Sequence, residues 1–265
     1  MLNQITPVLL TYNEAPNIER TLHALSWAQE IVVVDSFSTD ATLEVLAEFA
    51  RVRVVQRAFE NHADQWNYGI SETGIETEWI LALDADWVVT DALRSEVATL
   101  VPPPDVAAYA VPFKYCVYGQ VLHGSLYPPT IALYRRGAGH YDMDGHTQRV
   151  RIAGDTRQLA GYLLHDDRKS LQRWLWAQGR YAQLEANWLC SKSFAKLGLS
   201  HKLRRLCVVM PWLLPLYYLI VKGGLFDGRA GLVYALQRAA AEALIAVNIL
   251  ARHWDAACAG GEAEN

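Results

Sequence analysis

Cysteine is scarce in this chain, and its spacing excludes two kinds of site. The four cysteines are scattered along 265 residues, and no two of them form a CxxC pair. Such spacing excludes a cysteine-based zinc site and, in a chain of this size, gives no disulfide framework. The sequence also lacks a G-x-y period and any low-complexity tract, which excludes fibrous classes. We therefore expect a folded protein with reduced cysteines.

Two glycine-rich loops that bind phosphate are missing as well. Neither GxGxxG nor GxxxxGK occurs in the chain, which argues against a dinucleotide oxidoreductase and against a P-loop NTPase. The N-terminal stretch MLNQITPVLLTYNE has no basic region and no cleavage site, so we expect no signal peptide. The expected location is the cytoplasm.

The charges are distributed unevenly along the chain. A hydrophobic fraction of 52% is enough for a buried core, and the net charge of −4 argues weakly against a nucleic-acid binder. Residues 1–160 carry a net charge of −9, whereas residues 161–265 carry +5. We expect these two parts to meet different partners.

Short apolar runs alternate with helical patterns over the first ninety residues. The predicted strands cover residues 5–11, 31–34, 52–55 and 79–83. Helices are predicted between them at 17–28, from a cap at 38–40 to about residue 50, and at 64–72. This alternation indicates a parallel sheet that is covered on both faces by helices. Between 102 and 161 the pattern is irregular, with strands predicted at 109–118 and 131–135.

Polar side chains follow the predicted strands at the points where the strands end. They are Asn13, Glu14, Asp35, Asp84 and Asp86. In open α/β sheets ligands bind at this edge. The pair Asp84-x-Asp86 can hold Mg²⁺ or Mn²⁺, which in turn neutralises a diphosphate. The alternative is a helix cap, because another helix is predicted to begin nearby.

Three segments resemble the family 2 glycosyltransferases of the GT-A fold. They are LLTYNE at 9–14, VVVDSFSTDAT at 32–42 and LALDAD at 81–86. The resemblance is greatest to bacterial enzymes that extend lipopolysaccharide core or other envelope glycans. It implies a GT-A domain over residues 1–165, with a mostly parallel sheet and helices on both faces. Residues 166–265 resemble the helical, membrane-associated extensions of such enzymes.

The resemblance also implies a reaction and its donor site. The expected reaction is inverting transfer of a sugar from a nucleotide sugar, foremost a UDP-sugar, to a glycan or glycolipid acceptor. The implied donor-binding residues are Thr11, Asn13, Glu14, Asp35 and Asp84. Asp35 would accept a hydrogen bond from the base or ribose, and Asp84 would lie near the ribose and diphosphate.

A divalent cation, Mg²⁺ or Mn²⁺, is the cofactor that the resemblance implies. Asp86 would coordinate it. His165 is placed like the C-terminal histidine that GT-A enzymes often have beside the metal. The alternative for His165 is a structural residue before the next helix, where Asp166 and Asp167 suit the helix dipole.

The catalytic base is the least defined part of the expected site. Inversion needs a base to deprotonate the acceptor hydroxyl. Related enzymes often have a His-Glu pair here, where this chain has His146 and Thr147. Asp144 is the first candidate, His146 the second and Asp142 a third. A surface turn is the structural alternative for this segment.

The C-terminal part is basic and contains an apolar run. Residues 168–229 hold eleven Lys and Arg but two acidic residues, and Leu206–Val221 has sixteen uncharged residues. A spanning helix needs about 20 apolar residues, and two prolines interrupt this run. We therefore expect an interfacial or re-entrant segment on the anionic inner face of the cell membrane. The alternative is a buried helix; the apolar run argues against a nucleic-acid partner.

Two other functions agree with parts of the sequence. A catalytically inactive nucleotide-sugar-binding or scaffold subunit would explain the missing glutamate at 147. A nucleotidyltransferase also uses paired aspartates with Mg²⁺, but LLTYNEAPNIE lacks the Gly/Arg/Lys-rich triphosphate loop expected near its N-terminus.

Overall fold

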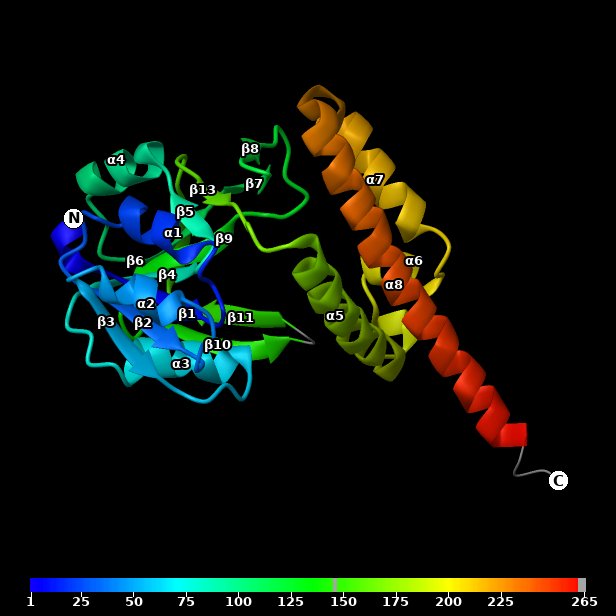
Figure 1. The fold of residues 1–265 in the computed structure, drawn as a ribbon. Helices are drawn as coiled ribbons and strands as arrows, with labels where there is room; N and C mark the ends of the chain where they lie inside the picture. Colours follow the sequence, from blue (N-terminus) through cyan, green and yellow to red (C-terminus); the bar gives the residue numbers. More distant parts are fainter. Residues whose placement is uncertain (145–146, 262–265) are drawn as a thin grey trace. The chain divides into compact units, whose positions relative to one another are not determined.

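The computed structural model describes residues 1–144 and 147–261, and the chain divides into two compact units (Figure 1). Unit 1 comprises residues 1–121 and 125–169, and unit 2 comprises residues 122–124 together with the chain from 170 onward. The sequence predicts the boundary between the catalytic domain and its C-terminal extension after residue 165. The division falls later because Asp167 and Lys169 still bond to side chains of unit 1.

Unit 1 is built on a seven-stranded sheet of order β12-β6-β9-β4-β1-β2-β3. Its strands are β1 (Ile5–Thr11), β2 (Ile31–Asp35), β3 (Val52–Gln56), β4 (Trp79–Asp84), β6 (Val106–Val111), β9 (Thr130–Arg135) and β12 (Asp155–Gln158). The strands β4, β1, β2 and β3 are parallel, and β9 runs antiparallel between β4 and β6. The mostly parallel α/β sheet expected from the sequence is confirmed.

Helices cover both faces of this sheet. They are α1 (Ile18–Ala24), α2 (Thr42–Ala47), α3 (His62–Ser71) and α4 (Asp91–Thr99). Neighbouring strand residues enter different cores: Leu9 and Val33 pack with α1, α2 and α4, whereas Val8 and Val32 pack with α3. Because both faces are covered, the central strands read as continuous apolar runs.

The first two helices are shorter than the sequence predicts. After Ala24 the chain continues as turns, in which Leu25 and Ala28 donate backbone hydrogen bonds and remain buried in the core. Helix α2 ends at Ala47, before the predicted end near residue 50; ahead of it the Asp40 carboxylate accepts from the Thr42 backbone N–H. In both places the apolar residues recur with helical spacing because they are buried in the core, although the chain there is not a regular helix.

The stretch that looked irregular in sequence contains small strands. A four-stranded sheet of order β5-β13-β7-β8 joins β5 (Trp87–Val89), β13 (Leu163–His165), β7 (Phe113–Val117) and β8 (Gln120–Val121). A separate hairpin pairs β10 (Gly139–Asp144) with β11 (Thr147–Ile152). The single strand predicted at 109–118 is divided at Pro112, which has no N–H to donate to a ladder.

Unit 2 is helical. It contains α5 (Leu171–Ser191), α6 (Leu199–Arg205), α7 (Met210–Val221) and α8 (Gly228–Gly261). The Arg204 guanidinium lies 2.7 Å from Glu242 and 3.2 Å from Glu185, and both carboxylates are buried. This cluster ties α6 to α8 and α5.

A third buried carboxylate in unit 2, that of Asp227, organises the junction between α7 and α8. Asp227 accepts from the Tyr218 hydroxyl at 2.8 Å and from the His123 backbone N–H at 3.0 Å. The contact with His123 joins residues 122–124 to this unit although they are remote in sequence.

By length and composition, the stretch Gly224–Trp254 satisfies the requirement for a membrane-spanning helix. Its most apolar window has a mean hydropathy of 1.3 and is 39% buried. Helices in the cores of soluble proteins meet the same requirement, so this stretch is weak support for a span.

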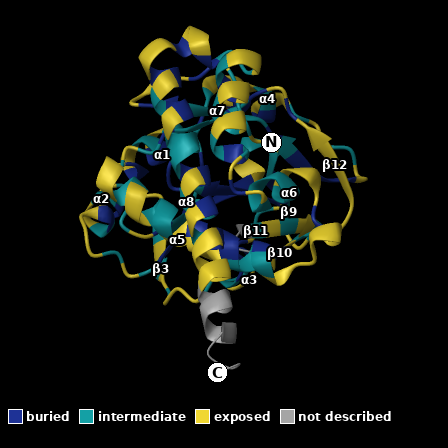
Figure 2. Cartoon of the chain, turned by 90° about the vertical axis from the view of Figure 1, so that its right-hand side faces the viewer, coloured by how far each residue is buried: buried dark blue, intermediate teal, exposed yellow. Residues whose placement is uncertain are grey.

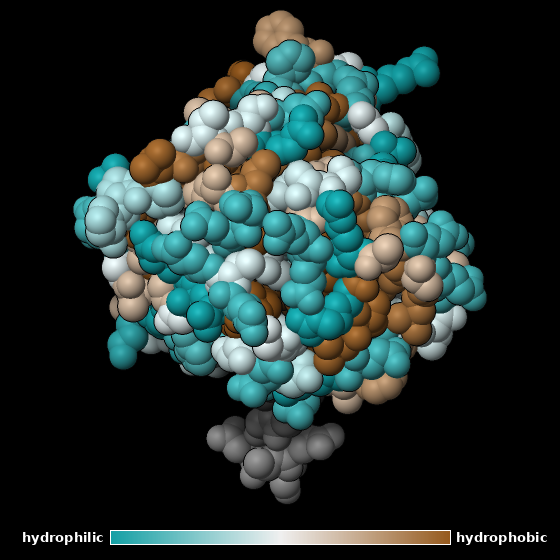
Figure 3. Space-filling model, turned by 90° about the vertical axis from the view of Figure 1, so that its left-hand side faces the viewer, coloured by the Kyte–Doolittle hydropathy of each residue, from teal (hydrophilic) through white to brown (hydrophobic). Residues whose placement is uncertain are grey.

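Figure 3 shows one face of the molecule, on which hydrophilic residues predominate and hydrophobic ones lie in small groups.

Candidate active site at the carboxyl edge of the sheet

The register of the central strands brings three of the expected site residues to one edge. Thr11 is paired with Asp35 across β1 and β2, and Leu10 is paired with Asp84 across β1 and β4. Because these strands are parallel, their last residues meet at the same edge, where ligands bind in open α/β sheets.

The Asp35 carboxylate is fully buried and already has several donors. It accepts from the Thr11 hydroxyl at 3.0 Å, from the Ser38 backbone N–H at 2.9 Å and from the Gln56 amide at 3.3 Å. The Ser38 hydroxyl donates to it as well. A direct bond from a base or ribose therefore requires a ligand to replace one of these contacts, of which the Gln56 bond is the longest.

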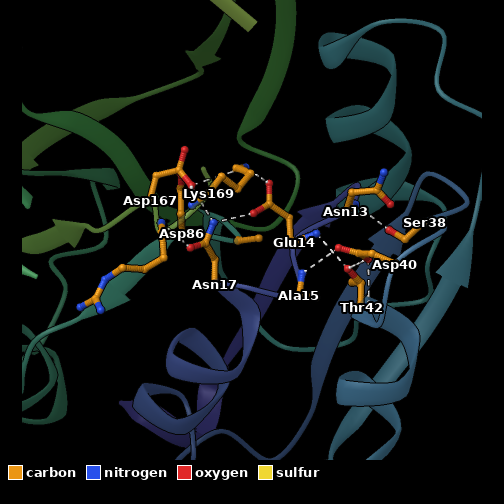
Figure 4. A network of polar contacts seen from close by, with 12 residues as sticks. Asn13, Glu14, Ala15, Asn17, Ser38, Asp40, Thr42, Asp86, Asp167 and Lys169 are labelled. Atoms are coloured by element: carbon orange, nitrogen blue, oxygen red, sulfur yellow. Dashed lines mark hydrogen bonds and ion pairs between the residues drawn. The ribbon is translucent and has the colours of Figure 1, made fainter. Parts of the chain in front are cut away.

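The loops after β1 and β2 are bound to each other by reciprocal hydrogen bonds (Figure 4). The Asn13 backbone N–H donates to the Ser38 hydroxyl at 2.9 Å, while the Asn13 side-chain oxygen accepts from the Thr39 N–H at 2.8 Å. The Glu14 N–H donates to Thr42. Asn13 has a φ of 57°, a left-handed conformation that asparagine tolerates better than most residues. The backbone beside the edge is thus held in one shape.

The Glu14 side chain faces a lysine that sequence reasoning missed. Its carboxylate accepts from Lys169 at 2.6 Å and from Asn17 at 2.8 Å, and Asn17 also donates to Asp167. Burial raises the pKa of Glu14, although Lys169 opposes that rise. Burial lowers the pKa of Lys169, but the nearby Glu14, Asp167 and Asp86 outweigh it, and the net shift is upward.

Asp86 and His165 are in direct contact. The His165 Nε2 lies 3.2 Å from the Asp86 Oδ2, because β13 runs antiparallel to β5 and pairs His165 with Trp87, next to Asp86. Burial opposes ionisation of both groups, but their mutual attraction outweighs it: the pKa of Asp86 is lowered and that of His165 is raised.

Two atoms of this pair remain without a hydrogen bond. The Asp86 Oδ1 and the His165 Nδ1 are buried and have no hydrogen-bond partner among the described residues. Unpaired buried polar atoms are costly, and in native structures they often mark a missing water or ion. The pair therefore presents one oxygen and one nitrogen atom that a bound cation can use as ligands.

Negative charge accumulates around this pair. Burial raises the pKa of Asp84 to about 7, and the neighbouring Asp86 and Glu14 add to the rise. A bound cation would relieve this repulsion. No group of three or more His, Cys, Asp or Glu side chains among the described residues is arranged to hold a metal. Mg²⁺ is commonly held by one or two carboxylates together with substrate phosphates and water, so Asp86 and His165 fit a cation shared with a diphosphate.

The candidate bases lie on the β10–β11 hairpin. Asp144 is the last residue of β10 and is paired with Thr147; its side chain, and His146 altogether, lie outside the described residues. Asp142 is described: the Arg151 guanidinium donates to its carboxylate, and His140 lies 3.6 Å away. Asp142 is thus engaged by its neighbours on the hairpin.

A family model and two curated relatives all describe glycosyltransferases. Residues 7–162 match the model described as Glycosyl transferase family 2. The lipopolysaccharide core biosynthesis glycosyltransferase LpsC of Rhizobium meliloti (strain 1021) is 24% identical over 260 residues, which cover 94% of this chain and 93% of LpsC. An uncharacterized glycosyltransferase of Rickettsia bellii (strain RML369-C) is 34% identical over 98 residues, 37% of this chain and 32% of that protein. The match thus spans about a third of the Rickettsia protein.

A likeness to a solved structure extends over most of the chain. The crystal structure of S. aureus TarS 1-349 in complex with UDP-GlcNAc is 13% identical, with a TM-score of 0.49 and coverage of 95% of this chain and 92% of that one.

Proposed function

The chain belongs to glycosyl transferase family 2 and is a glycosyltransferase; we propose that it moves a sugar, with inversion, from a nucleotide sugar to a lipid-linked or lipopolysaccharide-type glycan. The observation that carries this proposal is the contact between Asp86 and His165, whose unpaired buried atoms lie beside Asp84 at the edge where the parallel strands end.

The donor nucleotide is proposed to occupy the loops after β1 and β2. Thr11, Asn13 and Glu14 lie on the first of these loops or directly before it, and Asp35 ties it to the second. Asp84 would lie toward the ribose and diphosphate. The family resemblance favours UDP as the nucleotide. Binding of the nucleoside in a prearranged loop avoids the free-energy cost of ordering that loop on binding.

Asp86 and His165 would hold Mg²⁺ or Mn²⁺ together with the diphosphate of the donor. When bound, the cation supplies charge neutralisation for the diphosphate that leaves. The chain contributes the two ligands and keeps them oriented, since the Asp166 backbone N–H donates to the Asp86 carbonyl at 3.0 Å. Support for the assignment comes from the Asp86 Oδ1 and the His165 Nδ1, which are buried and have no hydrogen-bond partner among the described residues.

The acceptor hydroxyl is proposed to attack the anomeric carbon directly. A carbon–oxygen bond forms to the acceptor, the bond to the diphosphate breaks, and a side chain takes the hydroxyl proton. Asp144 remains the first candidate for this base and His146 the second. Asp142 is the weaker choice because Arg151 already occupies its carboxylate.

The acceptor is proposed to be lipid-linked, with unit 2 lying on an anionic membrane surface. Figure 2 marks exposed residues on the helices of unit 2, α7 among them. Helix α7 buries Met210 and Tyr218 and exposes a set of large apolar side chains, namely Trp212, Leu213, Leu216, Tyr217, Ile220 and Val221. Lys222 directly follows this helix. Exposed apolar residues beside basic ones suit the boundary between headgroups and acyl chains.

The structure changes which basic residues can meet lipid. Arg204 is mostly buried, because Glu185 and Glu242 bind its guanidinium. It belongs to the interior of unit 2. Lys202 and Arg205 lie half-buried on the same helix, where both pack over the Phe194 ring, and they are the better candidates for contact with anionic headgroups.

A second candidate function rests on one residue. Thr147 stands where related enzymes often have the glutamate of a His-Glu pair, which favours a catalytically inactive nucleotide-sugar-binding or scaffold subunit. Such a subunit would bind the donor and not turn it over.

The experiment that tests the proposal separates binding from turnover. UDP-, GDP- and CDP-linked sugars are screened for protection against thermal unfolding, with and without Mn²⁺, and then for transfer to lipid-linked glycans from bacterial membranes. A ligand at a hundred times its Kd stabilises a protein by about 2.7 kcal/mol. We expect protection by a UDP-sugar and repeated turnover. Protection without turnover would support the inactive subunit, and no protection by any nucleotide sugar would contradict both functions.

A further inference from the structure

A row of aromatic rings leads from His165 toward the surface of unit 1. The ring centroids of His165 and Tyr115 are 4.5 Å apart with the planes at 90°, and those of Tyr115 and Tyr127 are 5.4 Å apart. Phe113 lies against the row, stacked on Tyr127 at 6.2 Å and on Trp87 at 5.7 Å. The row therefore starts at the residue that contacts Asp86.

The outer ring of this row is held in place and yet open to solvent. Tyr127 is 43% exposed. Its backbone is fixed by Ser125, whose hydroxyl accepts from the Tyr127 N–H at 3.1 Å and donates to the Tyr127 carbonyl at 3.2 Å. Two prolines, Pro128 and Pro129, follow and restrict the chain further. A ring that is ordered without burial loses little entropy when a ligand packs on it.

From this arrangement we infer that Tyr127 and Tyr115 form the subsite for the sugar ring that accepts the transferred residue. A pyranose has apolar C–H faces and a rim of hydroxyl groups. Aromatic rings cover such faces by packing against them. The inference rests on the proposed function, because the row of rings marks an acceptor subsite only if the diphosphate of the donor lies at Asp86 and His165.

Position along the row assigns it to the acceptor. The donor sugar is covalently joined to the diphosphate and must lie directly beside Asp86 and His165. Tyr127 lies one ring farther out, beyond Tyr115, on the side open to solvent. An acceptor reaches the anomeric carbon from outside, so its ring is the one that Tyr127 can cover.

The test replaces the outer ring and measures each substrate separately. Tyr127→Ala removes the ring, Tyr127→Phe keeps the stacking face, and Tyr118→Ala removes a tyrosine that is 80% exposed on the neighbouring β7–β8 turn. The measurements are binding of core oligosaccharide released from lipopolysaccharide, binding of UDP, acceptor KM and kcat, and the midpoint of thermal unfolding.

We expect Tyr127→Ala to weaken oligosaccharide binding and raise acceptor KM about tenfold, a factor that corresponds to about 1.4 kcal/mol. UDP binding and the unfolding midpoint should stay at wild-type values. Tyr127→Phe and Tyr118→Ala should resemble the wild type. Unchanged acceptor binding and KM in Tyr127→Ala, an equal effect of Tyr118→Ala, or a loss of UDP binding instead would overturn the inference.

Failure of the proposed function gives a different result. If the oligosaccharide binds through Tyr127 but no nucleotide sugar is turned over, sugar binding at Tyr127 is supported and the transferase mechanism is contradicted. If transfer proceeds normally in Tyr127→Ala, the transferase mechanism is supported and the acceptor subsite at Tyr127 is contradicted.

Discussion

Replacing Asp84 by asparagine should stabilise the metal-free protein at pH 8 while it removes a group proposed for donor binding. Burial, with Asp86 and Glu14 nearby, raises the pKa of Asp84 to about 7 from an ordinary value of 3.8. One unit of pKa corresponds to about 1.4 kcal/mol, so the shift is worth about 4 kcal/mol at most. Because Asp84 keeps some contact with solvent, we expect a gain of about 2 to 4 kcal/mol.

The sign of the effect follows from the two protonation states. Below about pH 4 the carboxyl is protonated in both the folded and the unfolded chain, and it costs nothing. Between pH 4 and 7 the unfolded chain ionises first, so the wild-type protein loses stability as the pH rises. Above pH 7 the folded protein carries the full penalty. Asparagine has no charge, and its advantage should therefore grow across this range and then level off.

Urea unfolding in the presence of EDTA at pH 5, 6, 7 and 8 measures this difference. Asp155→Asn is the matched control, since it makes the same chemical change at an exposed position of β12. The reasoning is refuted if Asp84→Asn gives no stability gain at pH 8. It is also refuted if the gain at pH 5 is as large as the gain at pH 8.

Further outcomes test the metal, the base and the membrane surface. Asp86→Ala should abolish transfer and remove the effect of Mn²⁺ on UDP binding measured by calorimetry; full activity would contradict the metal assignment. Asp144→Asn should lower turnover about 10²–10⁴-fold at unchanged donor affinity, and wild-type turnover would exclude it as the base. Changing Lys202 and Arg205 to glutamate should reduce flotation with phosphatidylglycerol vesicles but spare UDP binding, whereas a wild type that never floats would contradict the membrane proposal. Arg204→Glu should instead destabilise the protein to urea by about 3–5 kcal/mol, because it leaves buried carboxylates unpaired; an unchanged midpoint would contradict that role.

The central sheet could be predicted because its signal is local. Strands such as Ile31–Asp35 are buried on both faces, so burial alone dictates a continuous run of apolar residues. The membership in glycosyl transferase family 2 was likewise carried by short segments at three strand ends. The small strands β5 and β13 were not predicted from the sequence. A three-residue strand is specified by the strands with which it pairs and has too few residues to show a sequence pattern of its own.

The missed parts of the site are contacts between distant positions. The bond between Glu14 and Lys169 joins residues 155 positions apart, and no spacing in the sequence points to it. The number of donors on Asp35 depends on Gln56 in a neighbouring strand, which a linear pattern does not show. The placement of His165 was foreseen only through the family resemblance.

The salt bridge of Lys169 has a consequence for dividing the protein. Lys169 holds Glu14 and is also the last residue of unit 1, so the covalent connection to unit 2 departs from the candidate active site. A catalytic fragment cut after 165 would lose this ammonium group. A transplanted or separately expressed catalytic module must carry its chain through Lys169, and whatever replaces unit 2 must be joined at that point.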